Sequence, residues 1–359
     1  MIYFSNSKKI FLLTICVLGF FLALPNFSKV NIPLFPKQTI NLGLDLRGGS
    51  YLLLEVDTNS IKNDRSQSLL EDIRSTFRQN KIKYFGLKTN KNGVQVTVRD
   101  ELKIKEARKL IQELNTSSSN LFSNTNNKEF SINGNDNFFL LELNDNSLKE
   151  KYRSAVSQSI EIIRRRIDGL GVTEPSIQRQ GNNRILLEVP GMDDPQRLKD
   201  LLGQTAKLNF RMVDTSISVN EARQTRVPSR SEIISDENGF EYLVMKKVLV
   251  SGERLVDAQA SFDQATNAPI VNFRFDALGG KYFAKATSEN VGKPFAIILD
   301  NEVISAPVIR TPILGGSGQI EGGFTVEEAN NLSILLRAGA LPAPLEILEE
   351  KTIGPGLGK

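Results

Sequence analysis

Residues 148–213 read LKEKYRSAVSQSIEIIRRRIDGLGVTEPSIQRQGNNRILLEVPGMDDPQRLKDLLGQTAKLNFRMV, and this stretch decides the fold. Apolar residues recur at spacings of three and four in its first third, as in an amphipathic helix. A Gly-Asn-Asn turn then joins two strand-like segments, and an Asp-Pro pair typical of a helix start follows them. The stretch therefore predicts a helix (Leu148–Asp168), a hairpin of two strands (Ser176–Gln180 and Arg184–Val189), a short helix (Pro195–Gly203) and a strand (Lys207–Val213).

The segments on the N-terminal side suggest a repeat of this pattern. Phe138–Leu143 predicts a strand, so the order from there on is strand, helix, strand, strand, helix, strand, as in a ferredoxin-like sandwich. A similar order begins with the strand Tyr51–Val56 and the helix Ser60–Asn80. It continues through two strands and a helix at Tyr84–Thr89, Val94–Arg99 and Leu102–Leu114. We therefore expect an α+β protein with two such units, or one larger mixed sheet that receives all the strands.

The composition excludes several classes of active site. The 359 residues include no His, so a Ser-His-Asp triad, a Cys-His pair and a His metal ligand are all impossible. Cys16 is the single cysteine, which excludes an intramolecular disulfide and a cysteine-cluster zinc site. The net charge of +4 is small for this length and gives no argument for nucleic-acid binding.

An uncharged apolar run, Ile10–Leu24, follows Lys8 and Lys9. Fifteen helical residues span about 22 Å, and extension to Phe27 brings the run close to the roughly 30 Å of a bilayer core. Pro25 makes a poor cleavage site, so an uncleaved anchor is preferred over a cleaved signal peptide. The two lysines favour a cytoplasmic N-terminus.

The pattern of apolar residues changes at Asp214, where a polar stretch without regular periodicity begins, and further strands and helices follow it. Thr325 and Glu328 form a predicted capping box for the helix Val326–Ala338, which Gly339 ends. Leu345–Leu348 predicts a late strand.

Short motifs carry little chemistry. The glycine-rich loops match no phosphate-binding pattern and predict tight turns. Arg164, Arg165 and Arg166 cannot share one helix face, and the solvated side of the helix explains the first two. The remaining motif comprises Asp45, Arg47, Gly48 and Gly49. The preferred interpretation is a structural bracket beside the membrane, and the alternative is a ligand site.

Long stretches of the chain resemble the SecD family, a bacterial Sec translocase component that works with SecF. The matching stretches include INLGLDLRGGSYLLLEVD (40–57), IEIIRRRIDGLGVTEPSIQRQGNNRILLEVPG (160–191), PFAIILDNEVISAPVI (294–309) and FTVEEANNLSILLRAGALPAPLEILEEKTIGPGLG (324–358). The resemblance is weaker over Asp57–Asn137. It implies five further membrane helices beyond Lys359, with the acidic site that the family uses for proton coupling.

The resemblance also implies a base and a head. The expected division begins with an anchor (1–27), a linker with the first base strand (28–56) and a variable α/β insertion or first ferredoxin-like repeat (57–147). The base (148–213), the head (214–340) and a returning base strand (341–359) follow. We expect the head to turn on the base about two chain crossings, with hinge residues Val213, Asp214, Thr215, Gly339, Ala340, Pro342 and Pro344.

The function that the resemblance implies is a non-enzymatic, membrane-anchored export subunit without a cofactor. Such a subunit assists late translocation and release of polypeptides on the periplasmic side, driven by the proton-motive force. Its expected partners are SecF, the SecYEG channel and an unfolded translocating polypeptide, and its expected place is the bacterial inner membrane. The alternatives are a single-pass anchored envelope binding protein outside the translocase and, less favoured, a hydrolase that uses carboxylates and lysine.

Overall fold

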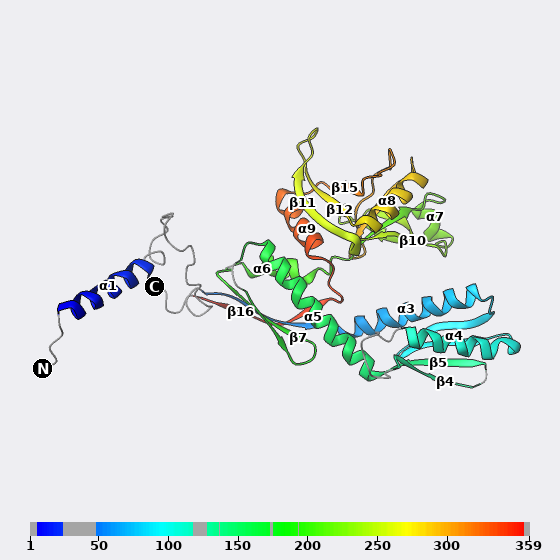
Figure 1. Cartoon of the computed structure of the whole chain (residues 1–359). Coiled ribbons are helices and arrows are strands. Elements are labelled where there is room, and N and C mark those ends of the chain that lie inside the picture. The colour runs from blue at the N-terminus through cyan, green and yellow to red at the C-terminus, as the bar shows by residue number, and fades with distance from the viewer. Residues whose placement is uncertain are drawn as a thin grey trace.

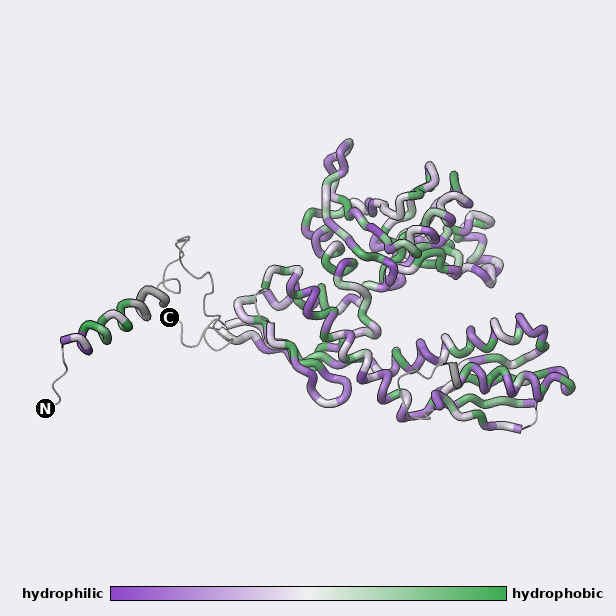
Figure 2. The backbone as a smooth tube through the Cα atoms, in the orientation of Figure 1, coloured by the Kyte–Doolittle hydropathy of each residue, from purple (hydrophilic) through white to green (hydrophobic). Residues whose placement is uncertain are grey.

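The computed structural model describes residues 6–23, 48–117, 128–135, 137–172, 175–192 and 194–354. The first described element is the helix α1 (Asn6–Ala23), which coincides with most of the predicted anchor and carries many hydrophobic residues (Figure 2). Among the residues described, no helix is both long enough and apolar enough to cross a membrane. Asp45 and Arg47 of the predicted bracket lie outside the described ranges.

A four-stranded antiparallel sheet forms the middle of the molecule (Figure 1). Its strands stand in the order β16-β1-β7-β6, so the first and last strands that the structure describes are neighbours. Two helices, α5 and α6, pack on it. The bounds are β1 (Gly49–Val56), α5 (Asp145–Gly169), β6 (Ser176–Gln180), β7 (Arg184–Pro190), α6 (Pro195–Gly203) and β16 (Leu345–Ile353).

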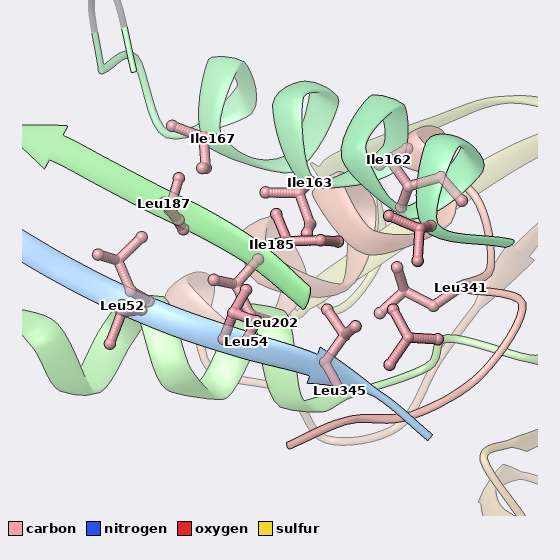
Figure 3. Close-up of a cluster of buried hydrophobic side chains, with 14 of the residues drawn as sticks. Leu52, Leu54, Ile162, Ile163, Ile167, Ile185, Leu187, Leu202, Leu341 and Leu345 are labelled. Atoms are coloured by element: carbon pink, nitrogen blue, oxygen red, sulfur yellow. The ribbon is translucent and has the colours of Figure 1, made fainter. Parts of the chain in front are cut away.

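The core of this middle unit lies between the sheet and its helices (Figure 3). Leu52 and Leu54 alternate along β1 and meet Ile163 of α5 and Leu202 of α6. All four are at most 1% exposed, and burial of such a side chain stabilises a fold by about 1.5–3 kcal/mol. The period-2 and period-3.6 patterns of the sequence therefore meet on one buried surface.

An insertion between β1 and α5 forms a second antiparallel sheet, in the order β2-β3-β5-β4. Its elements are α3 (Thr58–Gln79), β2 (Tyr84–Asn90), β3 (Gly93–Val98), a 3-10 turn (Glu101–Lys103), α4 (Ile104–Ser117), β4 (Phe130–Asn133) and β5 (Phe138–Leu143). The predicted repeat is wrong, because β5 pairs with β3 and β4 rather than opening the next unit. The alternative of one large mixed sheet is also wrong, because β1 and β5 lie in different sheets.

The head contains two further sheets, in the orders β14-β13-β8-β10-β9 and β11-β12-β15. Its elements are β8 (Leu208–Val213), α7 (Val219–Gln224), β9 (Ser231–Ser235), β10 (Glu241–Ser251), a 3-10 turn (Gly252–Arg254), β11 (Leu255–Phe262), β12 (Pro269–Phe275), α8 (Ala277–Glu289), β13 (Phe295–Leu299), β14 (Glu302–Ser305), β15 (Ser317–Ile320) and α9 (Val326–Ala338). The predicted capping box of α9 is confirmed. The predicted base–head boundary at 213/214 is wrong, because β8 pairs with β10 and β13 of the head.

The long helix α5 connects all three units (Figure 1). Tyr152, near its start, packs against the core of the insertion, and Ile163 lies in the core of the base. At its end, a Cβ added to Gly169 would lie 2.9 Å from Cγ2 of Ile334 in α9. This close approach brings the last turn of α5 into contact with the head.

Candidate functional site: a cavity in the head and its junction with the base

A cavity of about 1350 Å³ opens in the head. The strand β15 lines one part of it, and residues 307–311 line another. Its deeper surface is apolar and comes from β8, β12, α8, β13 and the segment after β14, through Phe210, Phe273, Phe283, Phe295, Ile297 and Ile309. A cavity with this lining can hold apolar side chains of a bound chain.

Phenylalanine rings make the deep surface rigid. The ring of Phe210 lies with its centroid 5.4 Å from that of Phe273, 5.9 Å from that of Phe283 and 5.6 Å from that of Phe295. These spacings are those of favourable aromatic pairs. All four side chains are at least 96% buried in the head core, so they form the closely packed floor beneath the cavity.

The rim of the cavity is polar and carries both charge signs. Arg274 lies 3.9 Å from Asp257 across the β11–β12 pair, and Arg310 and Glu321 stand elsewhere on the rim. Asp263 also lines the cavity, and hydrogen bonds from the backbone and side chain of Thr266 lower its pKa. That carboxylate therefore holds a turn. Mixed charges of this kind select no one sign of ligand charge.

The described ranges contain no group of three or more Cys, Asp or Glu side chains that could hold a metal ion. The arrangement in the head is therefore one of apolar and hydrogen-bonding surfaces.

The head joins the base through two chain segments, 204–207 and 339–341, which a hydrogen bond from Leu341 N to Thr205 O (2.8 Å) links directly. Arg166 of α5 is fully buried beside them. Its guanidinium donates to the carbonyl oxygens of Leu201 and Gln204, both at 2.6 Å. It also donates to those of Thr205 at 3.2 Å and Gly339 at 3.4 Å. One side chain of the base thus holds both crossings.

The burial of this cation has an electrostatic cost. Desolvation lowers the pKa of Arg166 to about 10, and the nearby carboxylate of Asp300 partly opposes that change. The guanidinium therefore stays charged at neutral pH, and each of its hydrogen bonds is charge-assisted.

Asp300 holds the first crossing from the side of the head. It lies in the turn between β13 and β14, with φ of 48°. Its carboxylate accepts hydrogen bonds from the backbone N–H of Ala206 and Lys207, both at 2.8 Å, and from the Thr205 hydroxyl. Ala206 itself has a φ of 59°, a conformation unusual for alanine. The base cation and the head anion therefore fix one short segment between them.

Apolar packing closes the junction. Leu201 of α6, Ala206 of the crossing and Leu335 of α9 form a small buried cluster, against which Leu170 and Leu299 pack. These residues come from the base, the crossing and the head. The junction between head and base therefore has a small apolar core, which holds the head in the orientation seen in this structure.

The predicted hinge residues separate into three places. Val213 and Asp214 lie inside the head sheet, where their N–H groups donate to Pro294 O (3.2 Å) and Leu243 O (2.7 Å). The prediction of Val213, Asp214 and Thr215 as a crossing is therefore wrong. Gly339 and Ala340 do lie at the second crossing, and Gly339 has a φ of 94° with open space around it.

The two prolines of the predicted hinge lie on the base side of that crossing. Pro344 O accepts a hydrogen bond from Asp57 N at 3.0 Å, which ties it to the end of β1. Ala343, between the two prolines, is completely buried in the base core. Pro342 contacts a small cavity of about 270 Å³ that Ile61 and Asp64 of α3 also line.

Gly48 and Gly49 bring the chain into the base sheet. Both have positive φ, 70° and 145°. The carbonyl of Gly48 accepts a hydrogen bond from Gly191 N at 2.9 Å, and a Cβ on Gly49 would lie 2.3 Å from Val189 O. Only glycine fits there, because the backbone of β7 occupies the space of a side chain. The two described glycines of the motif thus allow β1 to approach β7 closely.

Sequence reasoning missed Arg166 and Asp300. The signal for Arg166 was its position, because it stands three residues after Ile163 and four before Leu170 on the apolar stripe of the helix. A cation on such a stripe is buried with partners or marks an interface. Asp300 gave no comparable signal, since an Asp-Asn pair between two strands predicts only a turn.

Three family models match the chain. The SecD/SecF GG motif covers residues 34–60, the N-terminal part of the P1 domain of the SecDF protein translocase subunit covers residues 156–215, and the SecDF P1 head subdomain covers residues 227–343. The first of these contains Gly48 and Gly49, and the third contains most of the cavity lining.

Curated relatives match almost the whole chain. The protein translocase subunit SecD of Rickettsia bellii is 44% identical over 98% of this chain and 66% of its own length, and that of Acetobacter pasteurianus is 44% identical over 99% and 67%. The chain spans about two thirds of the length of these relatives. A crystal structure of SecDF in a super-membrane-facing form is 28% identical, with a TM-score of 0.50, over 99% of this chain and 36% of that one. The chain belongs to the SecD family of protein translocase subunits.

Proposed function

We propose that this protein is a non-enzymatic subunit of the Sec translocase that binds a polypeptide as it emerges and helps its late translocation and release. The observation that carries the proposal is the preformed apolar cavity with a mixed-charge rim in the head. Such a surface can receive many sequences, as a translocase subunit must. The relatives are protein translocase subunits, which supports the same role.

The base would carry the head at the membrane. We infer a ferredoxin-like fold for it, and the strand order β16-β1-β7-β6 together with the chain order strand, helix, strand, strand, helix, strand supports this assignment. The uncharged run Ile10–Leu24 after two lysines supports an uncleaved anchor with a cytoplasmic N-terminus and a periplasmic body. Intact-mass measurement on membrane-extracted protein tests this, and a chain beginning near Asn26 would contradict it.

The partners follow from the family. We infer that SecF and the SecYEG channel assemble with the full-length protein and that the proton-motive force drives its cycle. Co-purification of the full-length protein with SecF and the channel is the expected result. Isolation without either partner would favour an anchored envelope binding protein instead.

We also infer that the head turns on the base during this cycle. The open space and the positive φ at Gly339 support a pivot there, since glycine absorbs backbone rotation without a steric cost. The other pivot would lie at residues 204–206.

Site-specific photo-cross-linking in cells tests the proposed role of the cavity. A benzophenone side chain at Thr311, in the cavity wall, should cross-link to a translocating polypeptide that is stalled in the channel. The same group at Lys285, whose side chain is 73% exposed on α8 and outside the cavity, is the matched control. Equal cross-linking from both positions, or none from Thr311, would contradict a client-binding role of the cavity.

A further inference from the structure

The strand β15 leaves one of its edges open at the cavity. It is the last strand of the sheet β11-β12-β15, so only β12 pairs with it. Phe275 N donates to Gly316 O at 2.9 Å, which marks that residue pair as a hydrogen-bonded one. Because such pairs alternate along an antiparallel ladder, Gly318 and Ile320 also direct their backbone groups to β12. The N–H and C=O groups of Ser317, Gln319 and Glu321 point the other way.

Those three residues line the cavity, so their outward backbone groups face the space in which a ligand would lie. No strand of the head, all of which is described, pairs with that edge. An unpaired strand edge is a template for another extended chain.

A second strand-like segment lines the cavity elsewhere. Residues 307–309 pair with residues 292–295, through Phe295 N to Pro307 O (2.9 Å) and Ile309 N to Lys293 O (3.0 Å). The backbone groups of Val308 make no hydrogen bond with that neighbour, and its side chain is half exposed at the cavity. The cavity therefore has an extended backbone with one unpaired side in each of two walls.

The two faces of the β12–β15 ladder differ in character. Phe273 and Ile320 lie on the buried face, and the ring of Phe273 fills the place of a side chain at Gly318, with Cζ 2.6 Å from an ideal Cβ. Gln319 and its partner Asn272 lie on the opposite, exposed face. A strand added to β15 would direct alternate side chains toward the apolar interior and toward the polar rim.

We propose that the head binds an unfolded polypeptide by β-augmentation, with the client added as an extended strand along β15. This inference rests on the proposed function and specifies how the same cavity recognises its client. Backbone pairing gives affinity that does not depend on sequence, and the apolar cavity favours an apolar residue at every second position. Four residues of β15 span only about 13 Å, so the pairing is short and the client can leave again.

A pair of synthetic peptides tests the pairing directly. The first is a fluorescein-labelled twelve-residue peptide of alternating Leu and Ser. The second has the same sequence with four consecutive central amide nitrogens methylated, which removes donors from both edges of the peptide while all side chains stay. Fluorescence anisotropy with the full 359-residue chain in detergent should show binding of the first peptide, and at least about tenfold weaker binding of the second.

A pair of variants tests the same contact from the side of the protein. Gln319→Pro removes an outward N–H that β12 does not use, whereas Gln319→Ala removes only the side chain. We expect Gln319→Pro to weaken binding about tenfold and Gln319→Ala to leave it within twofold. Circular dichroism melting of both variants checks that the head stays folded.

The outcomes separate this inference from the proposed function. If both peptides bind equally well, the cavity binds polypeptide through side chains and β-augmentation is wrong. If Gln319→Pro is folded and binds like Gln319→Ala, the edge of β15 is not the pairing site. If neither peptide binds the wild-type chain, the client-binding role itself fails, and this inference fails with it.

Discussion

Replacement of Arg166 with methionine should destabilise the junction between head and base. The variant removes the donor from the carbonyls of Leu201 and Gln204, each at 2.6 Å, and a buried unsatisfied carbonyl costs up to about 3 kcal/mol. Thr205 O keeps its hydrogen bond from Leu341 N. The variant also avoids the burial of a cation. Desolvation lowers the pKa of Arg166 to about 10, which corresponds to a cost of roughly 3 kcal/mol for the charged form. The loss of about 6 kcal/mol minus this gain leaves a net destabilisation of about 3 kcal/mol.

Arg165 supplies the matched control for this experiment. It is the preceding residue on the same helix, but its side chain is 59% exposed and, within the described ranges, pairs only with Glu161. Arg165→Met should change the free energy of unfolding by less than about 1 kcal/mol, as expected for an exposed ion pair. Urea unfolding of the full chain in detergent, followed by circular dichroism, measures both variants.

Limited proteolysis locates the effect. Trypsin can cut after Lys207, at the first crossing, and we expect faster cleavage there in Arg166→Met than in Arg165→Met. Arg166→Lys keeps the charge but offers no planar fork for carbonyls on both crossings, so it should lie between the two. If Arg166→Met unfolds and is cleaved like Arg165→Met, then Arg166 does not hold the junction.

Three further substitutions follow from single contacts. Gly49→Ala should destabilise the base by at least about 2 kcal/mol, because φ of 145° is strained for alanine and its Cβ would overlap Val189 O; a melting temperature equal to wild type would refute this. Phe210→Ala should cost about 3–5 kcal/mol in the head, measured by urea unfolding, since four rings lose a central partner. Hydrogen bonds from Ser216 and Ser231 lower the pKa of Asp214, so its stabilising effect is present above pH 3.8 and is lost as pH falls through the lowered value. Asp214→Asn should therefore be less stable than wild type at pH 7 but lose less stability on acidification to pH 3. If both proteins lose the same free energy of unfolding between pH 7 and pH 3, Asp214 does not have this role.

Most helices and strands could be predicted from the sequence because their causes are local. The helix α5 follows from apolar spacing, and the start of α9 from the capping box of Thr325 and Glu328. The strand β4, in contrast, has no place among the predicted elements. The strand β4 is only four residues long and follows an Asn/Ser/Thr-rich stretch, so it had little local pattern to reveal it.

The pairing of strands could not be predicted because its causes lie far apart in the chain. Leu52 of β1 stands opposite Glu350 of β16, and nothing near either residue indicates the other. The same limit explains the misplaced boundary at 213/214. Phe210 and Met212 alternate with polar residues in β8 as they would in any half-buried strand, and only the neighbours β10 and β13 decide to which sheet β8 belongs.

The contacts of the junction set conditions on any rotation of the head. A turn of the head about Gly339 has to break the contact between Arg166 and Gly339 O and to separate the apolar side chain of Leu335 from Leu201. It also has to break the ion pair between Lys207 and Asp64 of α3, at 3.0 Å, although an exposed pair of this kind contributes less than about 1 kcal/mol. The buried cation and the apolar cluster of Leu201, Ala206 and Leu335 thus both oppose a rotation. A guanidinium that loses its carbonyl partners must gain others or reach water, so the new orientation has to open the junction around Arg166 or supply new acceptors. Any rotation of the head would therefore have to rearrange the contacts on the base side of the junction, which include the last turn of α5.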